Sequence, residues 1–170
     1  PPGATDGGIW CVTPHPTIPG RVLAGAGLYG TPGQYPGALY LSQNYGESWS
    51  RINTGSISGV AAVVFDPASP QIGYAGTEGG GMLKSTDGGT SWQPLTTWTS
   101  GDNVLAVAVH PTNHKVFVST MSAGQGIFVS ADGGQSWNRL AEQPTTGRCG
   151  NCSLLRERCR FYMPGGWNLA

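Results

Sequence analysis

Among the side chains of this sequence, the carboxylates are the best suited to catalysis, because two of them facing each other across a cleft can hydrolyse a glycosidic bond. Glu78 and Asp102 lie in glycine-rich stretches predicted to be loops, where functional residues often sit. Asp66 precedes Pro67 and is expected to be a turn residue. Simple exposure to solvent is the default expectation for a loop carboxylate. The candidate carboxylates that do not serve as the third side chain of the repeated motif described below are Asp6, Glu47, Asp66, Glu78, Asp102 and Glu142.

The three histidines indicate turns and not a metal site. His15 and His110 stand in His-Pro pairs, and His114 follows in the adjacent loop. No second ligand lies at a suitable spacing from any of them. The sequence also lacks a Ser-His-Asp order, a P-loop and a dinucleotide-binding motif. We therefore expect neither a bound metal nor a cofactor.

Three of the four cysteines crowd the C-terminal segment 141–170, which also holds four of the nine basic residues. We expect this segment to be a Cys- and Arg-rich tail or cap stapled by a disulfide. A zinc site is a less favoured interpretation, because the second C-x-x-C pair of a zinc ribbon is missing. A truncated or misread reading frame is a third interpretation. The disulfide candidates, in a pairing that the sequence does not choose, are Cys11, Cys149, Cys152 and Cys159.

Aromatic rings in predicted loops could bind a ligand. Trp98, Tyr29 and Tyr35 lie in or beside such loops, and exposed rings stack on sugar faces or anchor protein partners. Together with Glu78 and Asp102 they form the candidate ligand-binding set. Packing of these rings over the ends of strands is an equally weighted alternative.

An internal repeat indicates the elements that position these residues. The pattern S-x-(D/N)-x-G-x-S-W occurs three times, and its tryptophans stand at positions 49, 92 and 137. A period in the forties suits a sheet of four strands. We expect each copy to be a hairpin turn, closed by the third side chain and the glycine, whose tryptophan packs between sheets. The residues concerned are Ser42, Asn44, Gly46, Trp49, Ser85, Asp87, Gly89, Trp92, Ser130, Asp132, Gly134 and Trp137.

A second pattern recurs in step with the first. A strand, a proline-bearing turn and another strand are predicted at 12–25, 63–76 and 107–119. A third strand precedes each eight-residue motif, and a fourth begins at its tryptophan. Residues 1–140 therefore divide into three repeats of four short antiparallel strands, at about 9–53, 58–96 and 102–140.

The eight-residue motif resembles the Asp box, or bacterial neuraminidase repeat. That repeat occurs in the β-propellers of sialidases, xyloglucanase-type glycosidases, sortilin-like receptors and photosystem assembly factors. The resemblance implies an all-β fold of propeller-type, four-stranded antiparallel blades. It also implies that box residues are structural and lie away from the ligand face, so that Asp87 and Asp132 hold turns. It implies no particular activity, because one fold hosts many functions.

Three repeats are too few for a closed ring, since propellers close with about four to eight blades. Two chains could pair into six blades, a longer chain could supply the missing blades, or the repeats could stack in another assembly. Unpaired sheet edges and an uncovered blade face favour self-association or a partner chain. Asn44 carries no charge, so the first box is expected to be slightly weaker than the other two.

Composition narrows the class of function. A net charge of zero and 11% charged residues exclude the basic stripe of a nucleic-acid-binding protein. No apolar run approaches the roughly 20 residues that span a membrane. Few lysines, with much Gly, Ser, Thr and Asn, favour a secreted or cell-surface protein. The Arg-Ile-Pro signature of sialidases is absent, and with five basic residues before the tail their arginine triad is hard to assemble.

The leading hypothesis is a non-catalytic, extracytoplasmic binding or assembly module that recognises protein or glycan. One alternative is a fragment of a glycoside hydrolase of the xyloglucanase- or sialidase-like propeller type. Another is a structural subunit that polymerises edge to edge.

Overall fold

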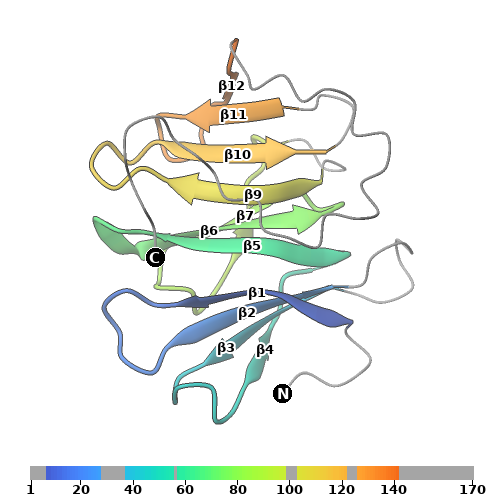
Figure 1. Cartoon of the computed structure of the whole chain (residues 1–170), viewed down its shortest axis with the longest axis vertical. Helices are drawn as coiled ribbons and strands as arrows, with labels where there is room; N and C mark the ends of the chain where they lie inside the picture. Colours follow the sequence, from blue (N-terminus) through green and yellow to red (C-terminus); the bar gives the residue numbers. More distant parts are fainter. Residues whose placement is uncertain (1–6, 28–36, 56, 99–102, 122–125, 142–170) are drawn as a thin grey trace, which may run out of the picture.

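The computed structural model describes residues 7–27, 37–55, 57–98, 103–121 and 126–141. Within these ranges the chain forms twelve strands joined by turns, and no helix. The strands fall into three groups of four, which follow one another along the long axis of the molecule (Figure 1). We call each group a blade.

In each blade, strands that are consecutive in the chain pair antiparallel. Blade 1 consists of β1 (Gly8–Pro14), β2 (Val22–Gly27), β3 (Ala38–Ser42) and β4 (Ser50–Ile52). Blade 2 consists of β5 (Gly59–Asp66), β6 (Ser69–Glu78), β7 (Met82–Ser85) and β8 (Gln93–Pro94). Blade 3 consists of β9 (Val104–Val109), β10 (Val116–Thr120), β11 (Gly126–Ser130) and β12 (Asn138–Arg139). The prediction of an all-β fold built from four-stranded antiparallel blades is confirmed.

Blades 1 and 2 are linked through one pair of residues, Gly27 of β2 and Gly59 of β5. A Cβ atom on Gly59 would lie 2.4 Å from Cζ3 of Trp10, and one on Gly27 would lie 2.6 Å from Cη2 of the same ring. Glycine is therefore required on both sides of this link, because any side chain would collide with the indole. Blade 3 forms a separate four-stranded sheet.

The hydrophobic core lies between the blades and is divided into clusters. The first cluster joins blades 1 and 2, and its members include Leu23, Leu39, Leu41, Val60, Val63, Phe65, Leu83 and Trp92. The second joins blades 2 and 3 and includes Tyr74, Met82, Trp98, Val104, Val107, Val116 and Val118. A third, smaller cluster in blade 1 consists of Ala24, Ala26, Ala38 and Tyr40, with Trp49 packed against it. Burial of these side chains between sheets is the main favourable term that holds the blades together.

Each blade has two faces, and the tryptophans distinguish them. We call the face turned toward the earlier blade the preceding face, and the opposite one the following face. Trp92 of blade 2 lies in the cluster shared with blade 1, where it is 3% exposed. Trp137 of blade 3 packs against the cluster shared with blade 2. The box tryptophan is thus carried on the preceding face of its blade.

Candidate functional site: the boxes and the blade junctions

Box 2 is a turn closed by its own side chains. Oδ1 of Asp87 accepts hydrogen bonds from the backbone N–H groups of Thr90 and Ser91, each at 2.9 Å, and from the Ser85 hydroxyl at 2.8 Å. Oδ2 accepts a bond from the Ser91 hydroxyl at 2.6 Å. The glycines at the fourth and fifth positions have φ values of +70° and +87°, which residues with side chains rarely adopt. Asp87 is therefore occupied as the lock of this turn.

Boxes 1 and 3 repeat this arrangement with small differences. Asp132 accepts bonds from the backbone N–H groups of Gln135 and Ser136, and from the hydroxyls of Ser130 and Ser136. In box 1 the Asn44 amide oxygen accepts a bond from the Ser48 N–H at 2.9 Å, and its amide nitrogen donates to the Ser48 hydroxyl. A neutral amide therefore reproduces most of the pattern, without the charge that strengthens a hydrogen bond.

Hydrogen bonding changes the acidity of both box aspartates. The hydroxyl of Ser136, followed by its N–H and the Ser130 hydroxyl, lowers the pKa of Asp132 far below the usual range. At Asp87, desolvation raises the pKa, but the combined hydrogen bonds from Ser91, Ser85 and Thr90 outweigh it and the pKa is lowered. Both groups are carboxylates at neutral pH, and neither is suited to donate a proton in catalysis.

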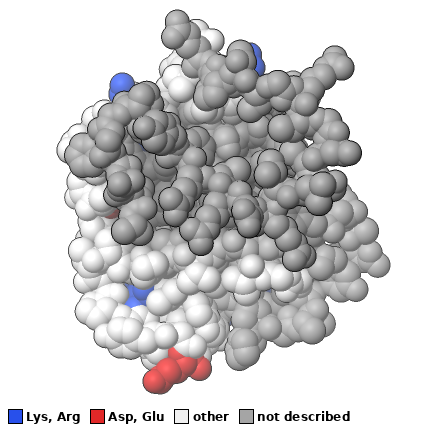
Figure 2. All heavy atoms as spheres, viewed as in Figure 1, with Lys and Arg blue, Asp and Glu red and all other residues white. Residues whose placement is uncertain are grey.

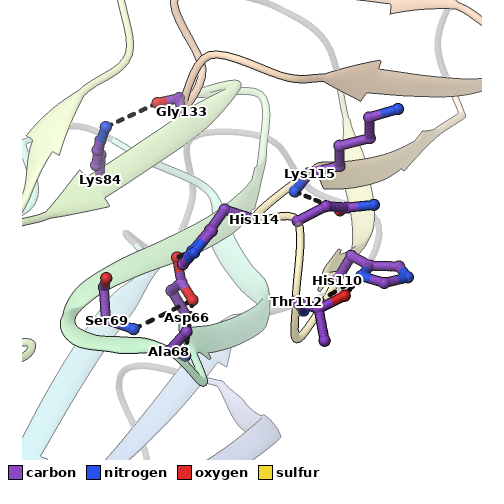
Figure 3. A network of polar contacts seen from close by, with 10 residues as sticks. Asp66, Ala68, Ser69, Lys84, His110, Thr112, His114, Lys115 and Gly133 are labelled. Carbon is purple, nitrogen blue, oxygen red and sulfur yellow. Dashed lines mark hydrogen bonds and ion pairs between the residues drawn. The ribbon is translucent and has the colours of Figure 1, made fainter.

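In boxes 2 and 3, the carbonyl oxygen at the fourth position accepts a hydrogen bond from a basic side chain of the preceding blade. Nη1 of Arg21, which directly precedes β2 of blade 1, donates to the carbonyl oxygen of Gly88 in box 2 at 2.9 Å. Nζ of Lys84 in β7 of blade 2 donates to the carbonyl oxygen of Gly133 in box 3 at 2.7 Å (Figure 3). Two different basic side chains thus perform the same task at successive junctions.

A carboxylate and a histidine also meet between blades 2 and 3. Oδ2 of Asp66 lies 2.7 Å from Nδ1 of His114, and Oδ1 of Asp66 accepts bonds from the N–H groups of Ala68 and Ser69 (Figure 3). The Asp66 side chain is 5% exposed, whereas that of His114 is 49% exposed. The pair resembles two members of a hydrolytic triad, but both oxygens of Asp66 are engaged in holding a turn and the adjoining blade. The expectation of a turn role for Asp66 fits this geometry, and the contact with His114 adds to it.

The structure separates the candidate ligand-binding residues. Trp98 is 8% exposed and packs edge-on against the rings of Phe128 and Trp137, so protein and not solvent surrounds it. This geometry fits the packing alternative for Trp98. Glu78 ends β6 and is partly exposed, and the next residue, Gly79, donates its N–H to the Asn103 side chain at 2.8 Å. Tyr29, Tyr35 and Asp102 lie outside the described residues.

Cys11 is a free thiol whose Sγ lies 3.7 Å from the carbonyl oxygen of Val60. Desolvation raises the pKa of this thiol, against the weaker effect of backbone hydrogen bonds. The other three disulfide candidates, Cys149, Cys152 and Cys159, fall in the part of the tail that is not described. No group of three His, Cys, Asp or Glu side chains that could hold a metal ion occurs within the described ranges.

The surface shown in Figure 2 carries few charged side chains on the described residues, and these are scattered apart from one acidic spot at the blade 1 end. Beside box 1 there is a pocket of about 300 Å³ lined by Leu41, Gln43, Asn44, Ser48, Trp49 and Ser50. In the part of the chain that the structure describes, no helix is long and apolar enough to cross a membrane.

The junction roles of Arg21, of Lys84 and of the contact between Asp66 and His114 were not predicted from the sequence. The partners of each lie in another blade, 48 to 67 residues away in the chain. One signal was available, because Arg21 and Lys115 each directly precede the second strand of their repeat.

Comparison with known proteins gives one family and several structural relatives. A family profile described as Sortilin, neurotensin receptor 3 (Sortilin-Vps10) matches residues 37–154. The GH74 xyloglucanase from Xanthomonas campestris is similar in structure, with a TM-score of 0.66 at 20% identity. YCF48 from Cyanidioschyzon merolae is also similar, with a TM-score of 0.59 at 20% identity. No curated protein sequence matches the chain.

The chain spans only part of these structures. The alignments cover 81% of the chain but 24% of the Xanthomonas xyloglucanase, and 82% of the chain but 38% of YCF48. The GH74 enzyme from Niastella koreensis gives a similar result, with a TM-score of 0.65, 20% identity, and coverage of 82% and 23%. At these identities the likeness establishes a shared propeller fold.

Proposed function

Because the chain belongs to the Sortilin-Vps10 family of Asp-box β-propellers, we propose that it is a non-catalytic module that binds a protein or glycan partner outside the cytoplasm. The few lysines and the abundance of Gly, Ser, Thr and Asn support the extracytoplasmic location. The fold alone does not choose between binding and catalysis, since propellers host many functions. The choice rests on how the carboxylates are used.

The observation that carries the proposal is that the best-placed carboxylates are engaged in structural hydrogen bonds. Asp87 and Asp132 each accept four hydrogen bonds within their own turn. Asp66 accepts two backbone bonds and contacts His114. Glycoside hydrolysis needs one carboxyl group whose pKa is raised so that it can protonate the leaving oxygen. The pKa values of Asp87 and Asp132 are moved in the opposite direction.

A second candidate function is favoured by the likeness to GH74 enzymes. In that case the chain would be part of a glycoside hydrolase, and Glu78 would be the carboxylate left for chemistry. Asp102, or residues of further blades, would have to supply its partner. The two candidates differ in whether a bound polysaccharide is cleaved.

A paired binding and hydrolysis assay tests the proposal. The full chain is incubated with soluble xyloglucan, and released reducing ends are measured beside retention on a glycan array and on immobilised candidate proteins. We expect binding without release of reducing ends. Release that disappears in Glu78→Gln, but persists in the matched surface variant Gln93→Glu, would establish the hydrolase and overturn the proposal.

A further inference from the structure

The turn that joins β1 to β2 in blade 1 holds a buried histidine against blade 2. His15 is 7% exposed, and the centroid of its ring lies 4.6 Å from that of Phe65. Its Nε2 lies next to box 2, because a Cβ atom on Gly88 would be 3.1 Å from it. Arg21 closes the same turn, and its Nη1 donates to the Gly88 carbonyl oxygen. This turn therefore carries two side chains that contact blade 2.

The hydrogen bonds of the His15 ring fix its state of protonation. Nδ1 accepts hydrogen bonds from the backbone N–H groups of Thr17 at 3.2 Å and Ile18 at 3.0 Å, so the neutral ring carries its proton on Nε2. Nε2 is buried and has no hydrogen-bond partner among the described residues. A second proton would break both bonds to Nδ1 and leave a buried cation in which neither N–H group has an acceptor.

No described carboxylate forms an ion pair with His15 that would compensate a second proton. Arg21, on the same turn, is itself a cation. Asp87 in box 2 directs both carboxylate oxygens to hydrogen bonds within its own turn. Asp66 is engaged by its own turn and by blade 3. The Cys11 thiol of β1 is uncharged, because desolvation raises its pKa.

The surroundings of His15 therefore disfavour its protonated form. Desolvation lowers the pKa of His15, the Pro70 carbonyl acts in the opposite direction, and the charge of Arg21 adds to the lowering. An unperturbed histidine titrates at about pH 6.5, where Arg21 is protonated. Asp87 is ionised there, since its hydrogen bonds outweigh desolvation and lower its pKa. Among these groups, His15 is the one whose charge changes between about pH 7.5 and pH 5.5.

Blade 2 has a different side chain at the equivalent position of its turn. Asp66 stands before the turn proline, and its Oδ1 accepts two backbone N–H groups as Nδ1 of His15 does. Its Oδ2 lies 2.7 Å from Nδ1 of His114 in blade 3 (Figure 3). His114 can donate from Nδ1 whether its ring is neutral or protonated. Protonation of the histidine thus preserves the contact between blades 2 and 3, whereas it disrupts the one between blades 1 and 2.

We propose that His15 is a pH-sensitive latch between blades 1 and 2, closed when its ring is neutral and open when the ring is protonated. On protonation the ring leaves Phe65 for water, and its turn loses the two hydrogen bonds to Nδ1. Arg21, which this turn positions, then loses its place opposite the Gly88 carbonyl. The latch goes beyond the proposed function, because it does not depend on what the module binds.

The direction of the pH dependence follows from the lowered pKa. Because the folded chain favours the neutral ring, the contribution of His15 to stability is complete above the unfolded pKa, about 6.5. It is lost as the pH falls from that value to the lower pKa of the folded chain. Opening of the junction should therefore begin in mildly acidic solution, where the box aspartates are still ionised.

Hydrogen exchange of the tryptophan indoles, followed by NMR on the full chain, measures this opening. Trp92 is 3% exposed in the cluster shared by blades 1 and 2, and its Nε1 donates to Gly89. Trp98 is 8% exposed in the cluster shared by blades 2 and 3. After correction for the intrinsic pH dependence of exchange, the Trp92 indole should exchange severalfold faster at pH 5.5 than at pH 7.5. The Trp98 indole should show no such acceleration.

The variant His15→Asn separates the proton from the turn. The asparagine oxygen can accept the backbone N–H groups that Nδ1 accepts, but its side chain does not titrate. We expect the acceleration at Trp92 to disappear in this variant, whatever its stability at neutral pH. His110→Asn is the matched control, because His110 has the same turn position in blade 3 and accepts the N–H of Thr112 (Figure 3). In that variant the acceleration should persist.

The ring signals of His15 in the unsubstituted chain give a second measurement that does not require the variant to fold. Their titration midpoint should lie below about 6.5. A midpoint at or above that value, equal acceleration at Trp92 and Trp98, or acceleration that persists in folded His15→Asn would overturn the inference. None of these outcomes bears on the proposed function, which is tested by binding and hydrolysis at neutral pH.

Discussion

Thr97 donates its hydroxyl hydrogen to the carbonyl oxygen of Gly134 at 2.5 Å, across the junction of blades 2 and 3. In boxes 1 and 2 the corresponding carbonyls, those of Gly46 and Gly89, accept a bond from the indole Nε1 of the box tryptophan at 3.0 Å. The Nε1 of Trp137 is buried and lacks a partner among the described residues. In box 3 an inter-blade hydrogen bond thus occupies the acceptor that the tryptophan uses elsewhere.

In the variant Thr97→Val, the Gly134 carbonyl oxygen should accept a hydrogen bond from Nε1 of Trp137 instead. The lost hydroxyl costs about 1 kcal/mol, and the new indole bond offsets part of it, so the net loss should stay below about 1 kcal/mol. The indole N–H of Trp137 should become more protected from hydrogen exchange, which NMR measures directly. The indole of Trp92, already bonded to Gly89, serves as the control. Unchanged exchange of the Trp137 indole would show that the two groups do not compete.

Tyr45→Gly should stabilise the folded chain. Tyr45 has a φ of +59° at a box position where the other two copies carry glycine. Relief of this left-handed strain is worth about 1–2 kcal/mol, and the extra freedom of glycine in the unfolded chain offsets part of it. Urea unfolding should show a net gain of up to about 1 kcal/mol. The converse change, Gly88→Ala, should destabilise, because it combines a φ of +70° with a Cβ only 2.9 Å from Arg21 Nη1.

Acid should weaken the boxes through Asp87 and Asp132. Both pKa values are lowered in the folded chain. Their contribution to stability is therefore complete above the unfolded pKa, about 3.9, and is lost as the pH falls through the folded pKa values. Melting temperatures measured between pH 7 and pH 2 should fall at the acid end. In the double variant Asp87→Asn/Asp132→Asn this fall should be shallower, and an equally steep fall would locate the acid sensitivity elsewhere.

Asp66 should contribute more to the stability of the folded chain through its turn than through its contact with His114. Asp66→Ala leaves the N–H groups of Ala68 and Ser69 without their acceptor and removes the contact with His114, so we expect a loss of about 2–4 kcal/mol. His114→Asn removes only the half-exposed contact and tolerates the φ of +56° at this position. Its cost should be below about 1 kcal/mol. Chemical unfolding of the two variants gives the ranking, and a larger loss for His114→Asn would reverse the assignment.

Local features of the chain were predictable because local chemistry decides them. The alternation of strands with proline- and glycine-bearing turns depends on neighbours within a few residues, and the boxes close on their own side chains. The expectation that Asn44 makes a weaker lock rests on the same local chemistry. Such features require no knowledge of how the blades meet.

Features that depend on contacts between blades were not predictable. Trp98 stands in a stretch that reads as a loop, but Phe128 and Trp137 of blade 3 cover its ring. Asp66 and His114 are 48 residues apart, and no local pattern relates them. Arg21 and Lys84 occupy different places in their repeats yet serve equivalent carbonyls. The repeat pattern identifies the strands and boxes of each blade, whereas the contacts between blades depend on the three-dimensional arrangement.

The position of each box tryptophan on the preceding face has a consequence for truncation. Removing blade 3 would leave Trp92 covered, since its neighbours belong to blades 1 and 2, but it would uncover Trp98, whose ring Phe128 and Trp137 cover. Removing blade 1 would strip the cover from Trp92 and leave a large apolar ring in water. Shortening the array therefore exposes a different buried tryptophan at each end, Trp98 when blade 3 is removed and Trp92 when blade 1 is removed.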